Sequence, residues 1–304
     1  MMQVFGAILV VAAYLLLSIS SLVIYSLIGE GISLVLAMWI QNLVIVCIFL
    51  LRNLFTKKLE MPKRPKIIFF RSLTGVLYSL SYYSALKYAS FAEVGVLTNS
   101  FPLFIVLIAW FFLGEKVLLS QWIALGFGML GVWTILFSNV TSFWSVGIFF
   151  AAAASILWAA TMIIMQKVSE YEDVYTYLFT FFAFNLVLLF PFIVTTFQMP
   201  TFKQFFFCAI VAMIALLAQY LLFIAYRICS ATELAPYHFS FAFFHFLVAK
   251  GLFAFAPSLN FYIGAALIFF GGVINLILFE RKAVVVKENP PLEISLPEPS
   301  EPVE

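Results

Sequence analysis

Ten apolar runs, each about as long as a membrane is thick, constrain what this chain can fold into. A hydrocarbon core of about 30 Å needs roughly 20 apolar residues in a helix. By that measure, the predicted spans lie at residues 4–28, 33–53, 67–87, 92–113, 120–138, 143–165, 174–197, 204–227, 232–254 and 260–280. Hydrophobic residues make up 65% of the chain and charged residues 10%, which excludes a soluble globular domain. The sequence therefore predicts an all-α membrane protein with ten transmembrane helices.

The chain also overlays on itself after a shift of about 140 residues. The matching anchor residues are Ala85, Lys87, Ser90 and Glu93 in one copy and Ala225, Arg227, Ser230 and Glu233 in the other. Gly131-Val132 and Gly272-Val273 form a second pair near the ends of the fifth and tenth spans. Five helices per copy is an odd number, so the two copies must lie in opposite orientations across the membrane. We predict two inverted five-helix repeats, residues 1–142 and 143–282, around a central cavity.

The positive-inside rule gives an orientation for this arrangement. With the N-terminus in the cytoplasm, thirteen of the sixteen Lys and Arg residues fall on the cytoplasmic side, and Lys87, Lys203 and Lys250 fall outside. Both termini are therefore expected in the cytoplasm, with the chain in a bacterial inner membrane. The first apolar run lacks a basic segment before it and a small-residue cleavage site, so we expect a retained span. Residues 283–304 are rich in Glu and Pro and are expected to form a disordered cytoplasmic tail.

Polar side chains recur at helical spacing within several apolar runs. These stripes are Tyr14, Ser18, Ser21 and Tyr25 on the first span, Arg71, Gly75, Tyr78 and Tyr82 on the third, Ser155, Trp158, Met162 and Met165 on the sixth, and Glu233, Tyr237, Phe241 and His245 on the ninth, where His238 flanks the stripe. Inside a membrane, such side chains face the bundle interior or an aqueous cavity. The alternative is that they hold helices together through hydrogen bonds. The stripes on the first and sixth spans favour a cavity.

Further polar residues extend this set to the fourth and eighth spans. The predicted substrate-binding residues are Tyr14, Ser18, Ser21, Tyr78, Tyr82, Asn99, Trp158, Gln219, Tyr220, Tyr237 and His238. Met162 and Met165 are interpreted as packing residues or as an adaptable cavity wall.

Two repeated acids are better explained as helix caps than as transport residues. Ser90-x-x-Glu93 and Ser230-x-x-Glu233 each open a predicted helix in the capping-box pattern. The inverted topology puts them at opposite faces of the membrane, so they cannot form one site. The remaining titratable candidates are His238 and His245, and a packed neutral His is the commoner case. The sequence thus gives no firm support for proton coupling and leaves facilitated transport or exchange open.

The same scarcity of reactive side chains argues against an enzyme. The chain has two His and a single Asp, Asp173, with no Cys/His cluster at metal-binding spacing and no phosphate-binding glycine loop. We therefore expect no cofactor and no metal. The three Cys lie in or beside apolar runs and are interpreted as packing residues. A net charge of +2 gives no indication of nucleic-acid binding. The expected partners are a small-molecule substrate and the lipid bilayer, and a homodimer is left open.

An ordered series of short stretches resembles the EamA-type drug/metabolite transporter superfamily. In the first half these are Tyr83-x-Ala85-Leu86-x-Tyr88-Ala89-Ser90, Phe101-Pro102-Leu103-Phe104 and Trp110-Phe111-Phe112-Leu113-Gly114-Glu115-Lys116, and in the second half Ala225-Tyr226-Arg227, Ser230-Ala231-Thr232-Glu233-Leu234-Ala235-Pro236-Tyr237, Gly264 and Gly271-Gly272. The resemblance covers about residues 4–282. It implies ten helices in two inverted halves around a central cavity. It also implies transport of amino acids, nucleotide-like metabolites, sugars or drugs.

The second half departs from this pattern at one place. Where many members repeat the apolar-Gly-Glu ending seen at Leu113-Gly114-Glu115, this chain has Phe253-Ala254-Phe255-Ala256-Pro257. Because the second Glu is missing, a coupling role for Glu115 is harder to argue.

Three functional hypotheses follow. The first is a secondary transporter that moves an amino acid or nucleotide-like metabolite by alternating access, and Ala235-Pro236-Tyr237-His238 is similar to part of the S-adenosylmethionine uptake branch. The second is an efflux carrier for toxic aromatic or cationic compounds, which the Tyr, Trp and Phe faces would suit. The third is a non-transporting membrane scaffold or a lipid flippase.

Overall fold

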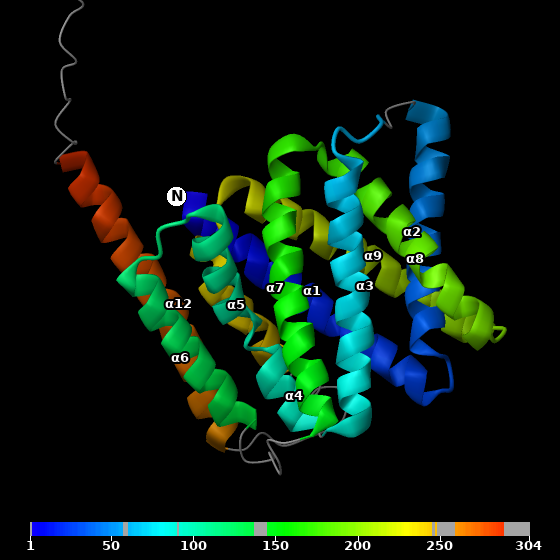
Figure 1. Cartoon of the computed structure of the whole chain (residues 1–304), viewed down its shortest axis with the longest axis horizontal. Coiled ribbons are helices and arrows are strands. Elements are labelled where there is room, and N and C mark those ends of the chain that lie inside the picture. The colour runs from blue at the N-terminus through cyan, green and yellow to red at the C-terminus, as the bar shows by residue number, and fades with distance from the viewer. Residues whose placement is uncertain are drawn as a thin grey trace, which may run out of the picture.

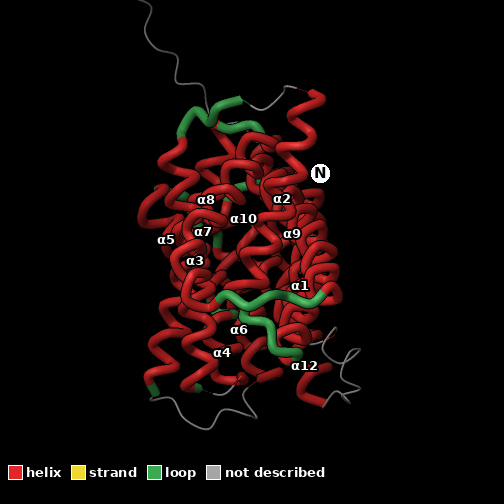
Figure 2. The backbone as a smooth tube through the Cα atoms, turned by 90° about the vertical axis from the view of Figure 1, so that its right-hand side faces the viewer, coloured by secondary structure: helices red, strands yellow, loops and turns green. Residues whose placement is uncertain are grey.

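The computed structural model describes residues 2–56, 60–89, 91–136, 145–244, 247 and 259–288 of the chain. Within these residues every regular element is helical and no strand occurs (Figures 1 and 2). Five helices are individually long and apolar enough to cross a membrane, which makes this an integral membrane protein. They are α1 (Met2–Gly29), α2 (Leu34–Thr56), α7 (Val146–Tyr171), α8 (Val174–Thr196) and α9 (Phe202–Ile228).

The other spans are less apolar, shorter or broken. They comprise α3 (Pro65–Tyr88), α4 (Phe91–Thr98), α5 (Phe101–Ile108) with the π-helical turn η1 (Ala109–Leu113), α6 (Leu119–Leu136), α10 (Ala231–Leu234) with the 3-10 helix η3 (Ala235–Phe239), and α12 (Leu259–Glu288). In chain order, with α4 and α5 as one span and α10 and η3 as the start of another, these elements match the ten predicted spans.

The predicted fourth span is interrupted where α4 ends and α5 begins. Pro102 stands in the first turn of α5, and it has no N–H with which to continue the helical hydrogen bonding of the preceding turn. Asn99 and Ser100 form the turn between the two helices, and the backbone N–H of Ser100 donates to the Leu97 carbonyl rather than one residue earlier. Asn99 therefore stands at the end of α4, where its backbone N–H still donates to the Gly95 carbonyl at 3.0 Å.

Helices of the first half pack mainly against helices of the second half. The main pairs are α1 with α9, α3 with α7, α2 with α8 and α6 with α12. The repeat relates α1 to α7, the first and sixth spans, and α3 to α9, the third and eighth spans. It therefore converts the pair α1–α9 into the pair α7–α3. The pairs α2–α8 and α6–α12 each map onto themselves. This pairing is what two inverted five-helix repeats require.

Both ends of the helical bundle lie at one face of the molecule. Figure 1 shows the start of α1, the end of α12 and the link from α2 to α3 at the same side. We call this side the N-terminal face. The opposite face contains the turn from α1 to α2, where Lys203 Nζ lies 2.7 Å from Glu30 Oε1.

The predicted capping box at the start of the ninth span is confirmed. The Glu233 carboxylate accepts from the Ser230 backbone N–H at 3.0 Å, and the Ser230 hydroxyl accepts from the Glu233 N–H at 3.4 Å. Glu233 is therefore engaged with its own helix start. Its counterpart cannot be compared, because Ser90 and the Glu93 side chain lie outside the described residues.

Candidate functional site

A cavity of about 290 Å³ lies between the two halves of the bundle. Its walls come from α1, α2, α3, the break between α4 and α5, α7, and the helical residues that follow η3. Six of the predicted substrate-binding residues line it together: Tyr14, Ser21, Tyr78, Tyr82, Asn99 and Trp158. The sequence stripes on the first, third and sixth spans thus converge on one space.

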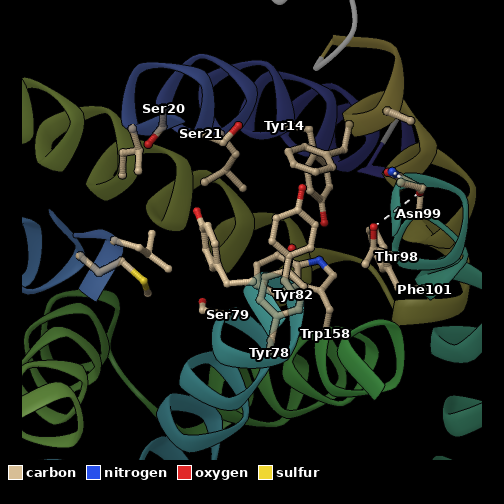
Figure 3. A pocket seen from close by; sticks show the side chains of 18 of the residues that line it. Tyr14, Ser20, Ser21, Tyr78, Ser79, Tyr82, Thr98, Asn99, Phe101 and Trp158 are labelled. Atoms are coloured by element: carbon tan, nitrogen blue, oxygen red, sulfur yellow. Dashed lines mark hydrogen bonds between the residues drawn. The ribbon is translucent and has the colours of Figure 1, made fainter. Parts of the chain in front are cut away.

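Aromatic rings form much of the cavity wall. Figure 3 shows Tyr14 pointing from α1 toward Tyr78 and Tyr82 on α3 and toward Trp158 on α7. The ring centroids of Tyr78 and Trp158 are 4.6 Å apart, and those of Tyr78 and Tyr82 are 6.0 Å apart. Phe101 meets Trp158 edge-on at 6.3 Å. Such a wall can stack on a flat ring or face a cation.

Two amide groups in the cavity wall have unused hydrogen-bonding atoms. Asn99 Nδ2 donates to the Gly95 carbonyl at 2.8 Å, but its Oδ1 is buried with no partner. Gln41 Nε2 on α2 is likewise buried and without a partner. Buried polar atoms are normally hydrogen-bonded, so this free acceptor and this free donor are available to a molecule that enters the cavity.

Gln41, Ser79 and Thr98 also line the cavity, although they are not among the predicted substrate-binding residues. The signal for Gln41 was available, since Gln41-Asn42 is the only pair of adjacent amides within the second apolar run. Ser79 and Thr98 gave no such signal, because both hydroxyls also donate to their own helix backbone, as isolated Ser and Thr in apolar helices commonly do.

Beside the cavity, His238 joins Tyr14 to a second tyrosine. His238 is fully buried, with Nδ1 2.5 Å from the Tyr14 hydroxyl and Nε2 2.7 Å from the Tyr226 hydroxyl. Both ring nitrogens are therefore occupied within the protein, and His238 positions Tyr14 instead of lining the cavity. Ser18 is also buried, and its hydroxyl donates to the Tyr14 carbonyl at 2.7 Å.

Three predicted residues lie elsewhere. Gln219 is turned toward Arg71, whose Nη2 donates to Gln219 Oε1 at 3.2 Å. Tyr220, the next residue on α9, is 37% exposed and belongs to a separate groove with α2 and α8. The Tyr237 hydroxyl accepts from Asn275 Nδ2 on α12 at 3.2 Å. His245, from the same stripe, lies outside the described residues.

On the N-terminal face, the carboxylate of Glu115 ties the two halves together. Its Oε1 accepts from Gln166 Nε2 at 2.8 Å, and its Oε2 accepts from the Thr232 hydroxyl at 2.7 Å and the Thr232 backbone N–H at 3.2 Å. Gln166 in turn accepts from the Ala231 N–H at 2.8 Å. Glu115, which directly follows the fourth span, therefore caps the start of α10, and Gln166 of α7 lies between them. This gives Glu115 a structural role that needs no repeated partner.

We expect Glu115→Gln to lower the stability of the protein by about 1–3 kcal/mol, because the new amide N–H₂ would face one of three donors and leave it unpaired. The measurement is the midpoint of thermal unfolding in detergent. Glu170→Gln is the matched control, since Glu170 on α7 is exposed and also loses one charge. Equal midpoints for the two variants would contradict this account of Glu115.

In the part of the chain that the structure describes, no group of three or more His, Cys, Asp or Glu side chains is placed to hold a metal ion. The described acidic residues are caps, surface residues or the Glu115 contact. The cavity itself is lined by aromatic, aliphatic, hydroxyl and amide groups, which bind ligands through stacking, apolar contacts and hydrogen bonds.

Comparisons with known proteins point to a single family. The model of the EamA-like transporter family matches residues 4–137 and 145–277. The pseudopaline exporter CntI of Pseudomonas aeruginosa is 24% identical over 170 residues, which cover 56% of this chain and 60% of the exporter. The riboflavin transporter of Rhizobium johnstonii is 30% identical over 176 residues, 55% of each chain. An uncharacterized transporter of Helicobacter pylori is 26% identical over 183 residues, 58% of this chain and 61% of that one.

The matched part of the chain thus spans little more than half the length of these curated relatives. The fold has a fuller match. One protein of known crystal structure superposes with a TM-score of 0.75 at 18% identity, over 92% of this chain and 98% of that one. At this identity the superposition shows a shared fold.

Proposed function

The chain belongs to the EamA-like transporter family, and from this premise we propose that it is a secondary transporter that moves a small organic metabolite across the membrane by alternating access. The observation that supports this most is the cavity between the halves, where aromatic rings surround an unpartnered amide oxygen and an unpartnered amide nitrogen. Sites at the interface of inverted repeats are where secondary transporters bind their substrates.

The proposed cargo is an amino acid or a nucleotide-like metabolite, with S-adenosylmethionine among the candidates. The aromatic wall suits a flat or cationic group, and the amides of Asn99 and Gln41 suit a ligand with its own donors and acceptors. Two relatives are named for organic cargo, pseudopaline and riboflavin, which supports an organic substrate here.

We further propose that the N-terminal face is cytoplasmic, in a bacterial inner membrane, and that it is closed in this conformation. The basic link before α3 lies on that face, as the positive-inside rule requires. The contacts of Glu115 and the fully buried His238 close the space beneath the cavity on that side. Cavity residues such as Ile24, Leu34 and Met38 lie toward the opposite face, near the α1–α2 turn.

The proposal is tested by flux in proteoliposomes that contain the purified full chain. Radiolabelled amino acids, adenosyl compounds and nucleotides are each offered with and without an excess of the same unlabelled compound inside, and protein-free liposomes serve as the control. We expect at least one compound to accumulate only with protein present and to be accelerated by the internal unlabelled compound. If liposomes with correctly folded protein take up no compound of the panel faster than protein-free liposomes do, the proposal is contradicted.

A second candidate function is efflux of toxic aromatic or cationic compounds, which the rings of Tyr78, Tyr82 and Trp158 favour. Cells that overproduce the protein would then resist such compounds, and the metabolite panel would show no flux. A scaffold or lipid flippase is the remaining alternative, and it predicts neither metabolite flux nor resistance.

A further inference from the structure

Arg71 is a buried cation, and no carboxylate among the described residues forms an ion pair with it. It stands on α3 and is 1% exposed, although a guanidinium group cannot lose its charge inside a protein. The ion pair seen among the described residues, Lys203 with Glu30, lies on the surface at the opposite face and does not involve it. An isolated charge inside a membrane protein costs several kcal/mol unless it is paired, and such residues mark substrate or ion pathways.

The contacts of Arg71 leave its Nε donor unused. Among the described residues, Nη2 donates to Gln219 Oε1 at 3.2 Å, and Nε is buried without a partner. The Phe181 ring lies 4.5 Å from Cζ. The buried Tyr177 hydroxyl lies close enough to interact with the guanidinium, and it has no other hydrogen-bond partner among the described residues. A guanidinium has five N–H donors in a planar fork, whereas the acceptors beside it are the Gln219 oxygen and the Tyr177 hydroxyl, so this cluster offers more donors than acceptors.

The backbone beside Arg71 leaves room for the charged group. A Cβ added at Gly75, one turn further along α3, would lie 3.3 Å from Arg71 Nη1. The absence of a side chain at this position therefore lets the guanidinium extend along α3 in the direction of Tyr78, which is part of the cavity wall. Tyr78 follows Arg71 by seven residues on the same helical face, a rise of about 10 Å.

We infer that Arg71, together with Gln219 and Tyr177, binds an anionic group, a carboxylate or a phosphate, of the transported substrate. This inference rests on the proposed transport function and adds the charge class of its substrate. A carboxylate or phosphate accepts two parallel bonds from the guanidinium fork and would use the donors that the protein leaves free. The substrate's apolar or ring portion would remain against the aromatic wall of the cavity, which lies further along α3. A substrate whose only charge is positive would be disfavoured by Arg71.

The test compares pairs of compounds that differ in one anionic group: phenylalanine with phenylalaninamide, and adenosine monophosphate with adenosine. Inorganic phosphate and tetraphenylphosphonium complete the panel. Each is added to the detergent-purified full chain, and the shift of the thermal midpoint against concentration gives an apparent Kd, because ligands that bind the folded state stabilise it by mass action. We expect the anionic member of at least one pair to bind at least about tenfold more tightly than its neutral or cationic partner, as charge-assisted hydrogen bonds predict.

Arg71→Gln should abolish this preference without unfolding the protein. Removing an unpaired buried charge is expected to leave the midpoint of the ligand-free protein unchanged or to raise it. Arg52→Gln is the control, because Arg52 on α2 is exposed and its loss removes the same charge. A lower ligand-free midpoint for Arg71→Gln with an unchanged preference for anions would show that Arg71 has only a structural role.

A preference for anions that persists in Arg71→Gln overturns the inference whatever the midpoint of the ligand-free protein. Two further outcomes also overturn it: no anion in the panel binds better than its partner, or inorganic phosphate stabilises the protein as well as the organic anions do. The proposed function fails separately. If proteoliposomes transport a compound but do not distinguish anionic compounds from their neutral or cationic partners, the protein is a transporter and only the assignment of Arg71 is wrong.

Discussion

Replacing Trp158 by alanine is expected to reduce transport by at least about 30-fold while the protein remains folded and inserted. Trp158 is half-buried on α7 and meets Tyr78 and Phe101, so its ring joins the wall contributed by α3 to the wall contributed by α5. Buried tryptophans in binding sites commonly contribute about 2 kcal/mol or more, which corresponds to this factor in rate or affinity.

Two variants separate the loss of a binding surface from general damage. Trp158→Phe keeps an aromatic face and should retain much of the flux, whereas Trp122→Ala removes a 41%-exposed tryptophan from α6 and should leave flux unchanged. Flux per inserted molecule is measured in proteoliposomes, with the thermal midpoint as the check on folding. Normal transport by Trp158→Ala would remove this cavity as the substrate site.

The predicted spans agree with the structure wherever a long apolar run is uninterrupted. Hydropathy measures how long a segment is apolar, and α1, α2, α7, α8 and α9 satisfy that measure directly. The breaks were harder to place, because they depend on single residues. Pro102 interrupts the fourth span, and Pro236 lies in η3, the 3-10 helix that follows α10 near the start of the ninth span. Both prolines were visible in the sequence, but a proline inside an apolar run can also be accommodated within a continuous membrane helix, as Pro191 is in α8.

The same local detail explains which of the predicted residues lie together in the cavity and which do not. Stripes on regular helices, such as Tyr78 with Tyr82, keep one face and meet in the cavity. Adjacent residues on an α-helix point about 100° apart, so Gln219 and Tyr220 cannot both face inward, and only Gln219 does. On the ninth span the expected spacing of four residues fails across η3, because a 3-10 helix turns once every three residues. Tyr237 therefore faces α12, while Phe241 reaches the cavity.

The surroundings of Arg71, which hold no counter-ion among the described residues, could not have been predicted from the stripe that contains it. The stripe shows that Arg71 and Tyr78 share a helical face, but it does not show what lies across from them. That depends on α8 and α9, which place Phe181 and Gln219 there instead of a carboxylate. Similarly, the position of Glu115 in the sequence of the first half gives no indication that Gln166 and Thr232 of the second half form hydrogen bonds with it.

The repeated pair of glycine residues leads to the second large effect. Gly131 and Gly272 occupy corresponding positions in the two repeats, yet only Gly131 lies at a tight helix crossing. A Cβ at Gly131 would stand 2.6 Å from the backbone oxygen of Gly264 and 2.7 Å from Ile268 Cγ1 on α12. A Cβ at Gly272 would instead make ordinary contacts of 3.6 Å or more with the Tyr237 ring. Small residues let membrane helices approach this closely, and here they join the fifth span to the tenth (Figure 1).

We therefore expect Gly131→Ala to lower the stability of the protein by about 1–3 kcal/mol, the usual cost of overpacking. The atom that must move is a backbone oxygen, so the helices have to separate along their contact. Gly126→Ala on the same helix is the matched control, because a Cβ there meets nothing within 4 Å. Its expected change has the opposite sign, since alanine favours a helix by up to about 1 kcal/mol over glycine.

The measurement is the thermal midpoint of both variants in detergent, followed by flux from the fraction that remains folded. Because neither α6 nor α12 lines the cavity, we expect Gly131→Ala to reduce the amount of active protein and to leave the apparent affinity for substrate unchanged. A Gly131→Ala protein as stable as Gly126→Ala would mean that α6 and α12 are not held at this distance. A changed affinity with unchanged stability would instead place the α6–α12 contact among the elements that move during transport.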